Sequence, residues 1–241
     1  ASCPMPKEFA QEEETMLLEN SNSRWHDNRG SPIILKFMND FNTNQIYNAE
    51  ISAGSLMLRE SRQVARLLLE GADDMVWHRA IYVDNILQKK VPATAKRMIR
   101  LIRNRLEPMS PELWKMIVKG TSEIAMQALL AAAIKHSRLL GDFLQDVIKE
   151  HYRIFNKQLS HQDWKKFLAT CELRDSVVST WSEKTRAKLG QVVFRIVAEA
   201  RYLDSTRSLK LTPVTLTPEV RSYLLKHEET YILKCMDVAH E

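Results

Sequence analysis

Helical periodicity, punctuated by Gly and Pro, is the feature that most limits how this chain can fold. From Tyr47 onward apolar residues recur at spacings of three and four, and few alternating patterns typical of strands occur before the C-terminal tail. The periodic segments are bounded by Ser, Thr or Asp at their starts and by Gly or Pro near their ends. The pattern therefore predicts a mainly α protein.

The expected helices follow one another closely along the chain. Gly71 is placed to end the first in a left-handed conformation, Asp73 or Asp74 to cap the second, and Gly120 to close the fourth. The Ala-rich centre of the fifth predicts burial on most sides. The predicted helical segments are 52–71, 75–87, 92–107, 111–120, 122–141, 142–155, 160–173 and 182–204.

The C-terminal tail has a different character. Residues 209–217 (LKLTPVTLT) and 231–238 (YILKCMDV) are rich in β-formers and flank the short helical run 218–227, which predicts a small β-hairpin or wing. We therefore expect an irregular or partly helical N-terminal arm (1–45), a helix-turn-helix-like domain (46–118), central packed helices (119–158) and a winged-helix-like C-terminal domain with a small β-hairpin (159–241).

The stretch from Leu87 to Leu106, LQKKVPATAKRMIRLIRNRL, carries seven cations and no carboxylate, although the chain contains 30 acidic residues. On a helical wheel its apolar residues form one stripe and most of its cations lie on the other side, so we expect the cations to face solvent. A third helix that follows a short turn matches the helix-turn-helix plan, in which that helix enters the DNA major groove. The stripe comprises Ala95, Met98, Ile99, Ile102 and Leu106, and the cations Lys96, Arg97, Arg100 and Arg103. A solvated basic face that pairs with acidic residues elsewhere is the alternative.

A second basic helix is expected at 182–204. Ser182 is a candidate cap, and Thr185 and Arg186 lie in the first turn, where winged-helix proteins often contact the DNA backbone. The apolar stripe consists of Leu189, Val193, Ile196 and Ala200, and the opposite face of Lys184, Lys188, Gln191 and Arg195. Two basic helices are less readily explained by chance than one.

The sequence contains no convincing pattern for catalysis or metal binding. Four dispersed histidines lack ligand spacing, and the small residues of SAGS (52–55) lack the spacing of a phosphate-binding loop, so we expect no enzyme, no metal site and no cofactor. Cys3, Cys171 and Cys235 are odd in number and far apart, which favours a reducing, cytoplasmic compartment over a disulfide framework. The most apolar window, 125–134, is too short for a membrane span.

Four segments, in order and spacing, closely resemble the BrxA family of BREX bacteriophage-defence systems. They are ISAGSLMLRESRQVARLLLEGAD, NILQKKVPATAKRMIRLIRNRLE, AMQALLAAAIKHSRLLGDFLQDV and WSEKTRAKLGQVVFRIVAEARYLD, and the resemblance extends from about Tyr47 to Cys235. It implies a small, mostly helical, non-enzymatic protein that binds double-stranded DNA and acts with other BREX components. The first 45 residues lie outside the match.

The prediction is therefore a non-enzymatic protein that binds double-stranded DNA mainly through the phosphate backbone. A protein-interaction scaffold within a BREX complex and an RNA-binding helical module are the alternatives. The predicted DNA-contacting residues are Lys89, Lys90, Thr94, Lys96, Arg97, Arg100, Arg103, Lys184, Thr185, Arg186, Lys188 and Arg195.

Overall fold

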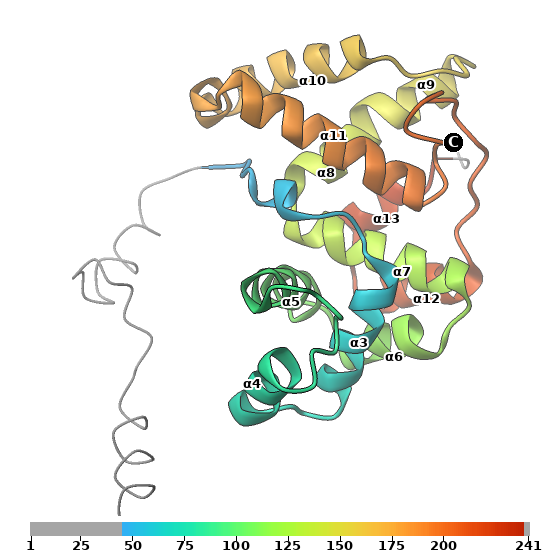
Figure 1. Ribbon diagram of the computed structural model, residues 1–241. Helices are drawn as coiled ribbons and strands as arrows, with labels where there is room; N and C mark the ends of the chain where they lie inside the picture. The colour runs from blue at the N-terminus through green and yellow to red at the C-terminus, as the bar shows by residue number, and fades with distance from the viewer. Residues whose placement is uncertain (1–44, 239–241) are drawn as a thin grey trace, which may run out of the picture. The chain divides into compact units, whose positions relative to one another are not determined.

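The computed structural model describes residues 45–238, and most of these residues are helical (Figure 1). The predicted arm at 1–45 lies, except for Gln45, outside the described residues. The helices are the 3₁₀ turn η2 (Glu50–Ala53), α3 (Leu58–Leu69), α4 (Asp74–Tyr82), α5 (Pro92–Leu106), α6 (Pro111–Lys119), α7 (Ser122–His136), α8 (Arg138–Phe143), the π turn η3 (Leu144–Ile148), α9 (Lys149–Arg153), α10 (His161–Arg174), the 3₁₀ turn η4 (Ser176–Thr180), α11 (Glu183–Glu199), α12 (Pro218–Lys226) and α13 (Thr230–Met236).

Helix α7 lies at the centre of this arrangement. It contacts α3, α5 and α6 on one side and α8, α12 and α13 on the other. The small side chains of Ala131, Ala132 and Ala133 are buried and let the neighbouring helices approach closely. The expected burial of this Ala-rich segment on most sides is confirmed.

One hydrophobic core runs through the described residues. It includes side chains from each of the three predicted parts, among them Leu106, Ile134 and Val193. The predicted boundaries at residues 118 and 158 do not separate cores. The domain division stays a prediction.

Several local signals act as predicted. Asp73 caps α4 by accepting a hydrogen bond from the Val76 amide, Ser182 caps α11, and Gly71 takes the left-handed conformation with φ of 69°. The two predicted apolar stripes are buried, except that Met98 is half-buried. Gly190 lets α10 and α11 approach, because a Cβ there would lie 2.7 Å from the Trp164 ring nitrogen.

Three predicted elements are wrong. The first helix begins at Leu58 rather than near Ser52, and residues 54–57 are irregular. The break after α7 falls at Ser137, so Gly141 lies inside α8, where the Tyr231 side chain packs over it. In the tail, 230–236 is helix α13 rather than a strand.

The tail differs for a physical reason. Ile232, Cys235 and Met236 recur at helical spacing and are all buried, so tertiary packing outweighs the β-propensity of the segment. Between residues 45 and 238 the predicted β-hairpin is absent, and the only β-pairing is two isolated bridges, Gln158 with Lys210 and Leu203 with Leu211.

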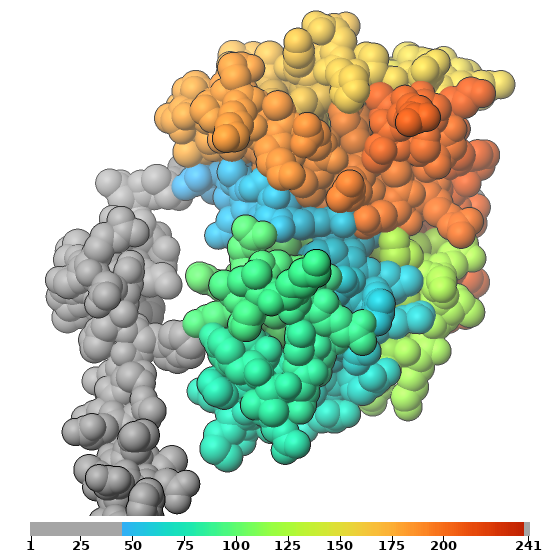
Figure 2. Space-filling model, viewed as in Figure 1, coloured from blue at the N-terminus to red at the C-terminus, as the bar shows by residue number. Residues whose placement is uncertain are grey.

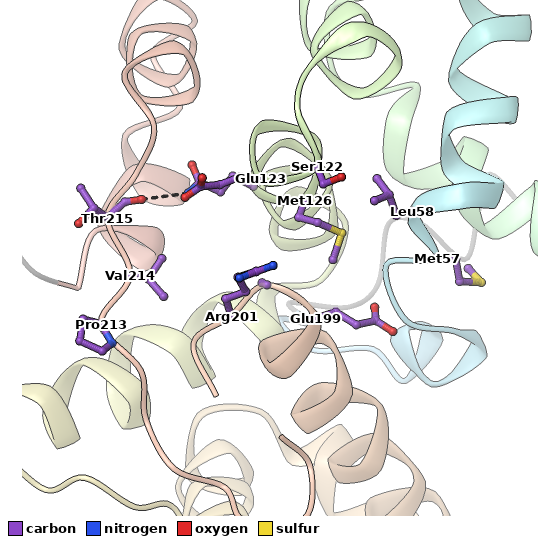
Figure 3. Close-up of a pocket in the computed structure, with 12 residues that line it drawn as sticks. Met57, Leu58, Ser122, Glu123, Met126, Glu199, Arg201, Pro213, Val214 and Thr215 are labelled. Atoms are coloured by element: carbon purple, nitrogen blue, oxygen red, sulfur yellow. Dashed lines mark hydrogen bonds between the residues drawn. The ribbon is translucent and has the colours of Figure 1, made fainter. Parts of the chain in front are cut away.

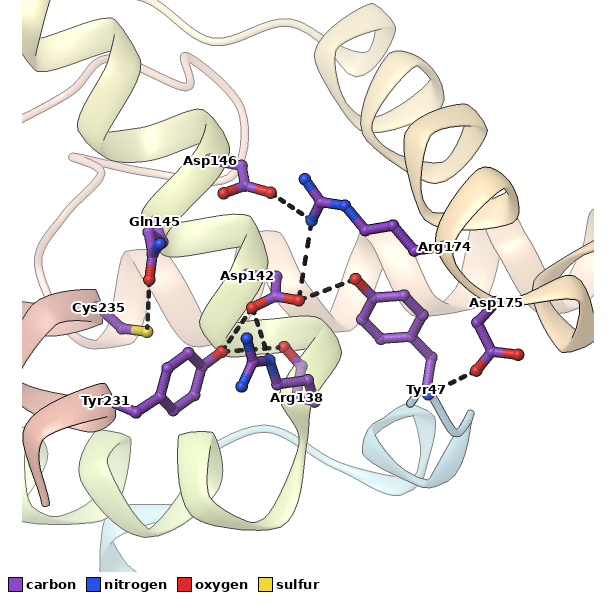
Figure 4. Close-up of polar contacts among 9 residues, drawn as sticks. All are labelled: Tyr47, Arg138, Asp142, Gln145, Asp146, Arg174, Asp175, Tyr231 and Cys235. Atoms are coloured by element: carbon purple, nitrogen blue, oxygen red, sulfur yellow. Dashed lines mark hydrogen bonds and ion pairs between the residues drawn. The ribbon is translucent and has the colours of Figure 1, made fainter. Parts of the chain in front are cut away.

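A buried carboxylate anchors the start of the unit (Figure 4). Asp142 of α8 is 5% exposed and accepts hydrogen bonds from the Tyr47 hydroxyl at 2.8 Å, the Tyr231 hydroxyl at 2.7 Å and Arg138 Nε at 2.8 Å. Asp175 accepts from the backbone amide of Tyr47 at 2.9 Å. The chain is thereby fixed to α8 and to the end of α10 before it enters η2.

Replacing Ile102 with Asp tests the assignment of the α5 faces. Ile102 is 1% exposed, so an unpaired charge there should destabilise the protein by about 3 to 5 kcal/mol, whereas Arg100→Ala on the exposed side of α5 should change little. Thermal and urea unfolding followed by circular dichroism measure both. Equal losses of stability would contradict the assignment.

Candidate nucleic-acid interface

The segment Gly54–Leu56, between η2 and α3, is held from two sides. Arg105 of α5 is 5% exposed and donates hydrogen bonds to the carbonyl oxygens of Ser55 at 2.6 Å and Gly54 at 2.8 Å. Glu199, the last residue of α11, accepts one from the Leu56 amide at 2.8 Å. We call these contacts the 54–56 clamp. Because they satisfy the backbone of this segment from outside, they explain why α3 does not begin at Ser52.

Burial lowers the pKa of Arg105 to about 10, and the Glu199 carboxylate opposes that shift. The guanidinium therefore keeps its charge at neutral pH. A buried cation from α5 and a carboxylate from α11 hold the same short segment, so the clamp couples the two basic helices.

A groove with a volume of about 640 Å³ lies above this segment. We call it the basic groove. Arg97 enters it from α5, and Lys188 and Arg195 from α11, and no carboxylate is among its lining residues. In Figure 2 the segment that forms its floor is seen between α5 and α11. The lining comprises Ser52, Ala53, Gly54, Ser55, Arg97, His161, Lys188, Gln191, Val192, Phe194, Arg195 and Thr206.

Helical spacing explains why α11 presents these groups together. Lys188, Gln191 and Arg195 lie three and four residues apart and are exposed, while Leu189 and Val193 between them are buried. The side chains of Gln191, Ser52, Ser55 and Thr206 add hydrogen-bond donors. The groove therefore offers cations and neutral donors to an anion.

The structure brings together only some of the predicted site residues. Arg97, Lys188 and Arg195 share the basic groove. Lys90, Lys96, Arg100 and Lys184 are exposed but do not line it. Thr94 is half-buried in the first turn of α5, and the Thr185 hydroxyl contacts that of Ser182 at 2.9 Å.

Three predicted cations are engaged within the fold. Lys89 pairs with Glu60 at 2.9 Å. Arg103 pairs with Glu107 at 2.7 Å and lies over the Trp77 ring at 4.6 Å. Arg186 pairs with Glu172 and donates to the carbonyl oxygens of Trp181 and Val178. These contacts place the three side chains in structural roles, and a DNA contact by any of them stays a prediction.

Several residues of the groove are not among the predicted site residues. Ser55, His161 and Thr206 reach it from three separate parts of the chain, and no local pattern marks them. Arg105 is one of the seven cations of the basic stretch, yet it is buried. The signal for its burial was present, because Arg105 follows Met98 by seven residues and Leu101 by four and so lies beside the apolar stripe.

Two other concavities carry carboxylates. The pocket in Figure 3, with a volume of about 450 Å³, has apolar side chains such as Met57, Met126 and Val214 together with Glu123 and Glu199. Arg201 projects into it. The second, near α9 and α10, includes Asp146, Glu150 and Asp163. Both suit an anion less well than the basic groove does.

The described part of the chain gives little support for metal binding, thiol chemistry or a membrane-spanning helix. From residue 45 to 238, no group of three or more His, Cys, Asp or Glu side chains is placed to hold a metal ion. Burial raises the pKa of Cys171 to about 12 and that of Cys235 to about 11, which makes both thiols poor nucleophiles. Among these same residues, no helix combines the length and apolar content that a membrane crossing requires.

Comparison with known proteins gives consistent matches. The family model BrxA matches residues 45–228. The chain is 45% identical over 193 residues to the BREX protein BrxA of Paramagnetospirillum magneticum (80% of this chain, 97% of the relative) and 35% identical over 175 residues to that of Escherichia coli O9:H4 (73% and 82%). A crystal structure of an uncharacterized protein from Magnetospirillum magneticum superposes with a TM-score of 0.74 at 43% identity, covering 80% of this chain and all of that one.

Replacing Arg105 with Met should destabilise the protein. The substitution leaves the carbonyl oxygens of Gly54 and Ser55 without their donor, at a cost of about 2 to 4 kcal/mol. Arg100→Met, an exposed change on the same helix, is the control. Urea unfolding measures both, and equal unfolding free energies would contradict the proposed clamp.

His136 should make stability depend on pH. Burial and the nearby Arg105 cation hold its pKa below the ordinary value, although Glu50 acts in the other direction. As the pH falls through about 6.5, the unfolded chain takes up a proton that the folded protein does not, so stability declines. His136→Gln should reduce the change in unfolding free energy between about pH 7.5 and 5.5. An unchanged pH dependence would show that His136 does not contribute.

Proposed function

Because the chain belongs to the BrxA family, we propose that it is a non-enzymatic component of a BREX phage-defence system that binds double-stranded DNA through the phosphate backbone. The observation that carries this proposal is the basic groove, where cations from two helices far apart in sequence meet without a carboxylate. Phosphate contacts by Lys and Arg supply most of the sequence-independent affinity of proteins for DNA.

The two basic helices have different roles in this proposal. The α4–α5 pair acts as a helix-turn-helix-like unit, with Arg97 and Arg100 on the exposed face of α5. Helix α11 acts like the DNA-facing helix of a winged-helix unit, without a β wing in the described residues. The clamp at 54–56 holds α5 and α11 so that both reach one duplex.

The side chains of the groove also suit backbone binding rather than base reading. Lys is a point charge, and the side chains of Ser, Thr and Gln donate hydrogen bonds to phosphate oxygens. Arg97 and Arg195 could each bind a phosphate with two parallel hydrogen bonds. We therefore expect affinity that varies little with DNA sequence.

A triple substitution of the groove cations tests the proposal. Each phosphate contact adds about 0.9 to the slope of log affinity against log salt, so replacing Arg97, Lys188 and Arg195 with Gln should reduce the slope by about 3 and weaken binding to all duplexes alike. Fluorescence anisotropy across a salt series measures this.

Lys115, Lys119 and Lys166 provide the matched control, because they are exposed, lie outside the groove and give the same change in net charge on replacement with Gln. If the control lowers the slope as much as the groove variant, the binding is diffuse and the groove is not the site. A comparison of duplex DNA, single strands and duplex RNA separates the DNA proposal from the RNA-binding alternative. If the protein binds none of the three nucleic acids, the DNA proposal is wrong and the protein-interaction scaffold is favoured.

A further inference from the structure

Helix α4 turns large apolar side chains outward. Met75 is 79% exposed, Val83 70%, Tyr82 47% and Val76 42%, while Trp77 and Ala80 on the inner side are buried. Figure 1 shows α4 at the periphery of the helices α3–α6. The inner residues Trp77 and Ala80, together with half-buried Ile81, attach the helix to the core.

The exposed residues form one surface rather than a scatter. Met75 and Tyr82 are seven residues apart, as are Val76 and Val83, so they recur on the same side of the helix over two turns. We call this surface the α4 face. Single exposed apolar residues are ordinary, but a contiguous group on one short helix is typical of an interaction site.

Carboxylates surround the α4 face. Glu70, Asp73, Asp74 and Asp84 are all exposed near its two ends. The one cation of the helix, Arg79, lies among the apolar residues on the same side and is 3.5 Å from Asp84. Residues 85–106, which follow directly, contain no carboxylate. The exposed carboxylates of this region therefore lie around α4, whereas its cations other than Arg79 belong to residues 85–106. The carboxylates around α4 would repel phosphate.

We propose that the α4 face docks a protein partner through a segment that presents apolar side chains flanked by Lys or Arg. The apolar stripe would bury against the partner's apolar side chains, and the carboxylates at both ends would meet its cations and set its orientation. A second copy of this chain docking face to face would bring carboxylates against carboxylates, which disfavours a symmetric dimer there. The docking does not depend on DNA binding.

A peptide titration tests the proposal directly. The probe is a labelled synthetic helix of about 18 residues with Leu on one face and Lys on the other, and its comparison carries Glu in place of Lys. The Leu/Lys peptide should bind at least about tenfold more tightly, and Met75→Ser with Val83→Ser should weaken that binding by about tenfold or more. Fluorescence anisotropy gives the affinities.

Phe155→Ser with Leu173→Ser is the matched control, because both side chains are 89% exposed and lie outside α4. It should leave peptide affinity unchanged, and circular dichroism should show both double variants folded. Unchanged affinity in the α4 variant, equal loss in the control, or equal binding of the two peptides would overturn the proposal.

Two further measurements sharpen the result. Duplex affinity should be the same in the α4 variant and the unsubstituted protein, so failure here is distinguishable from failure of DNA binding. In sedimentation velocity, self-association that the α4 substitutions abolish would overturn the proposal by identifying a second copy as the occupant. A monomer with both sequences would support it.

Discussion

The contact of buried Arg105 with the carbonyl oxygens of Gly54 and Ser55 sets the geometry on which the basic groove depends. A guanidinium taken out of water requires partners for its donors, and two adjacent backbone carbonyls provide them. Those carbonyls belong to the floor of the groove. The buried charge of Arg105 thus helps to fix the spacing of the exposed cations that line the basic groove.

The basic faces were readily predicted from the sequence. On α5 and α11 the separation of apolar and charged residues at helical spacing is strong, and the buried positions Ile99, Ile102, Leu189 and Val193 follow from it. Caps such as Asp73 and Ser182 are short-range signals that require only the neighbouring residues. These features are determined mainly by residues that are close together in the sequence.

The groove itself could not be predicted in the same way. Its floor is irregular because Arg105 and Glu199 bind the backbone there, and both lie far along the chain. The segment 230–236 shows the same limit, since burial of Ile232 and Cys235 against other helices outweighs a local preference for strand. Long-range contacts decided both cases.

The 54–56 clamp also limits when the basic groove can form during synthesis of the chain. Leu56 and Glu199 are 143 positions apart, so the chain must be made through the whole of α11 before the clamp can form. Contacts of such large sequence separation form late, after the local helices. Chains that stop before Lys188 would expose Arg97 of α5 without the α11 cations of the groove. A truncated product of that kind would therefore lack the assembled basic groove.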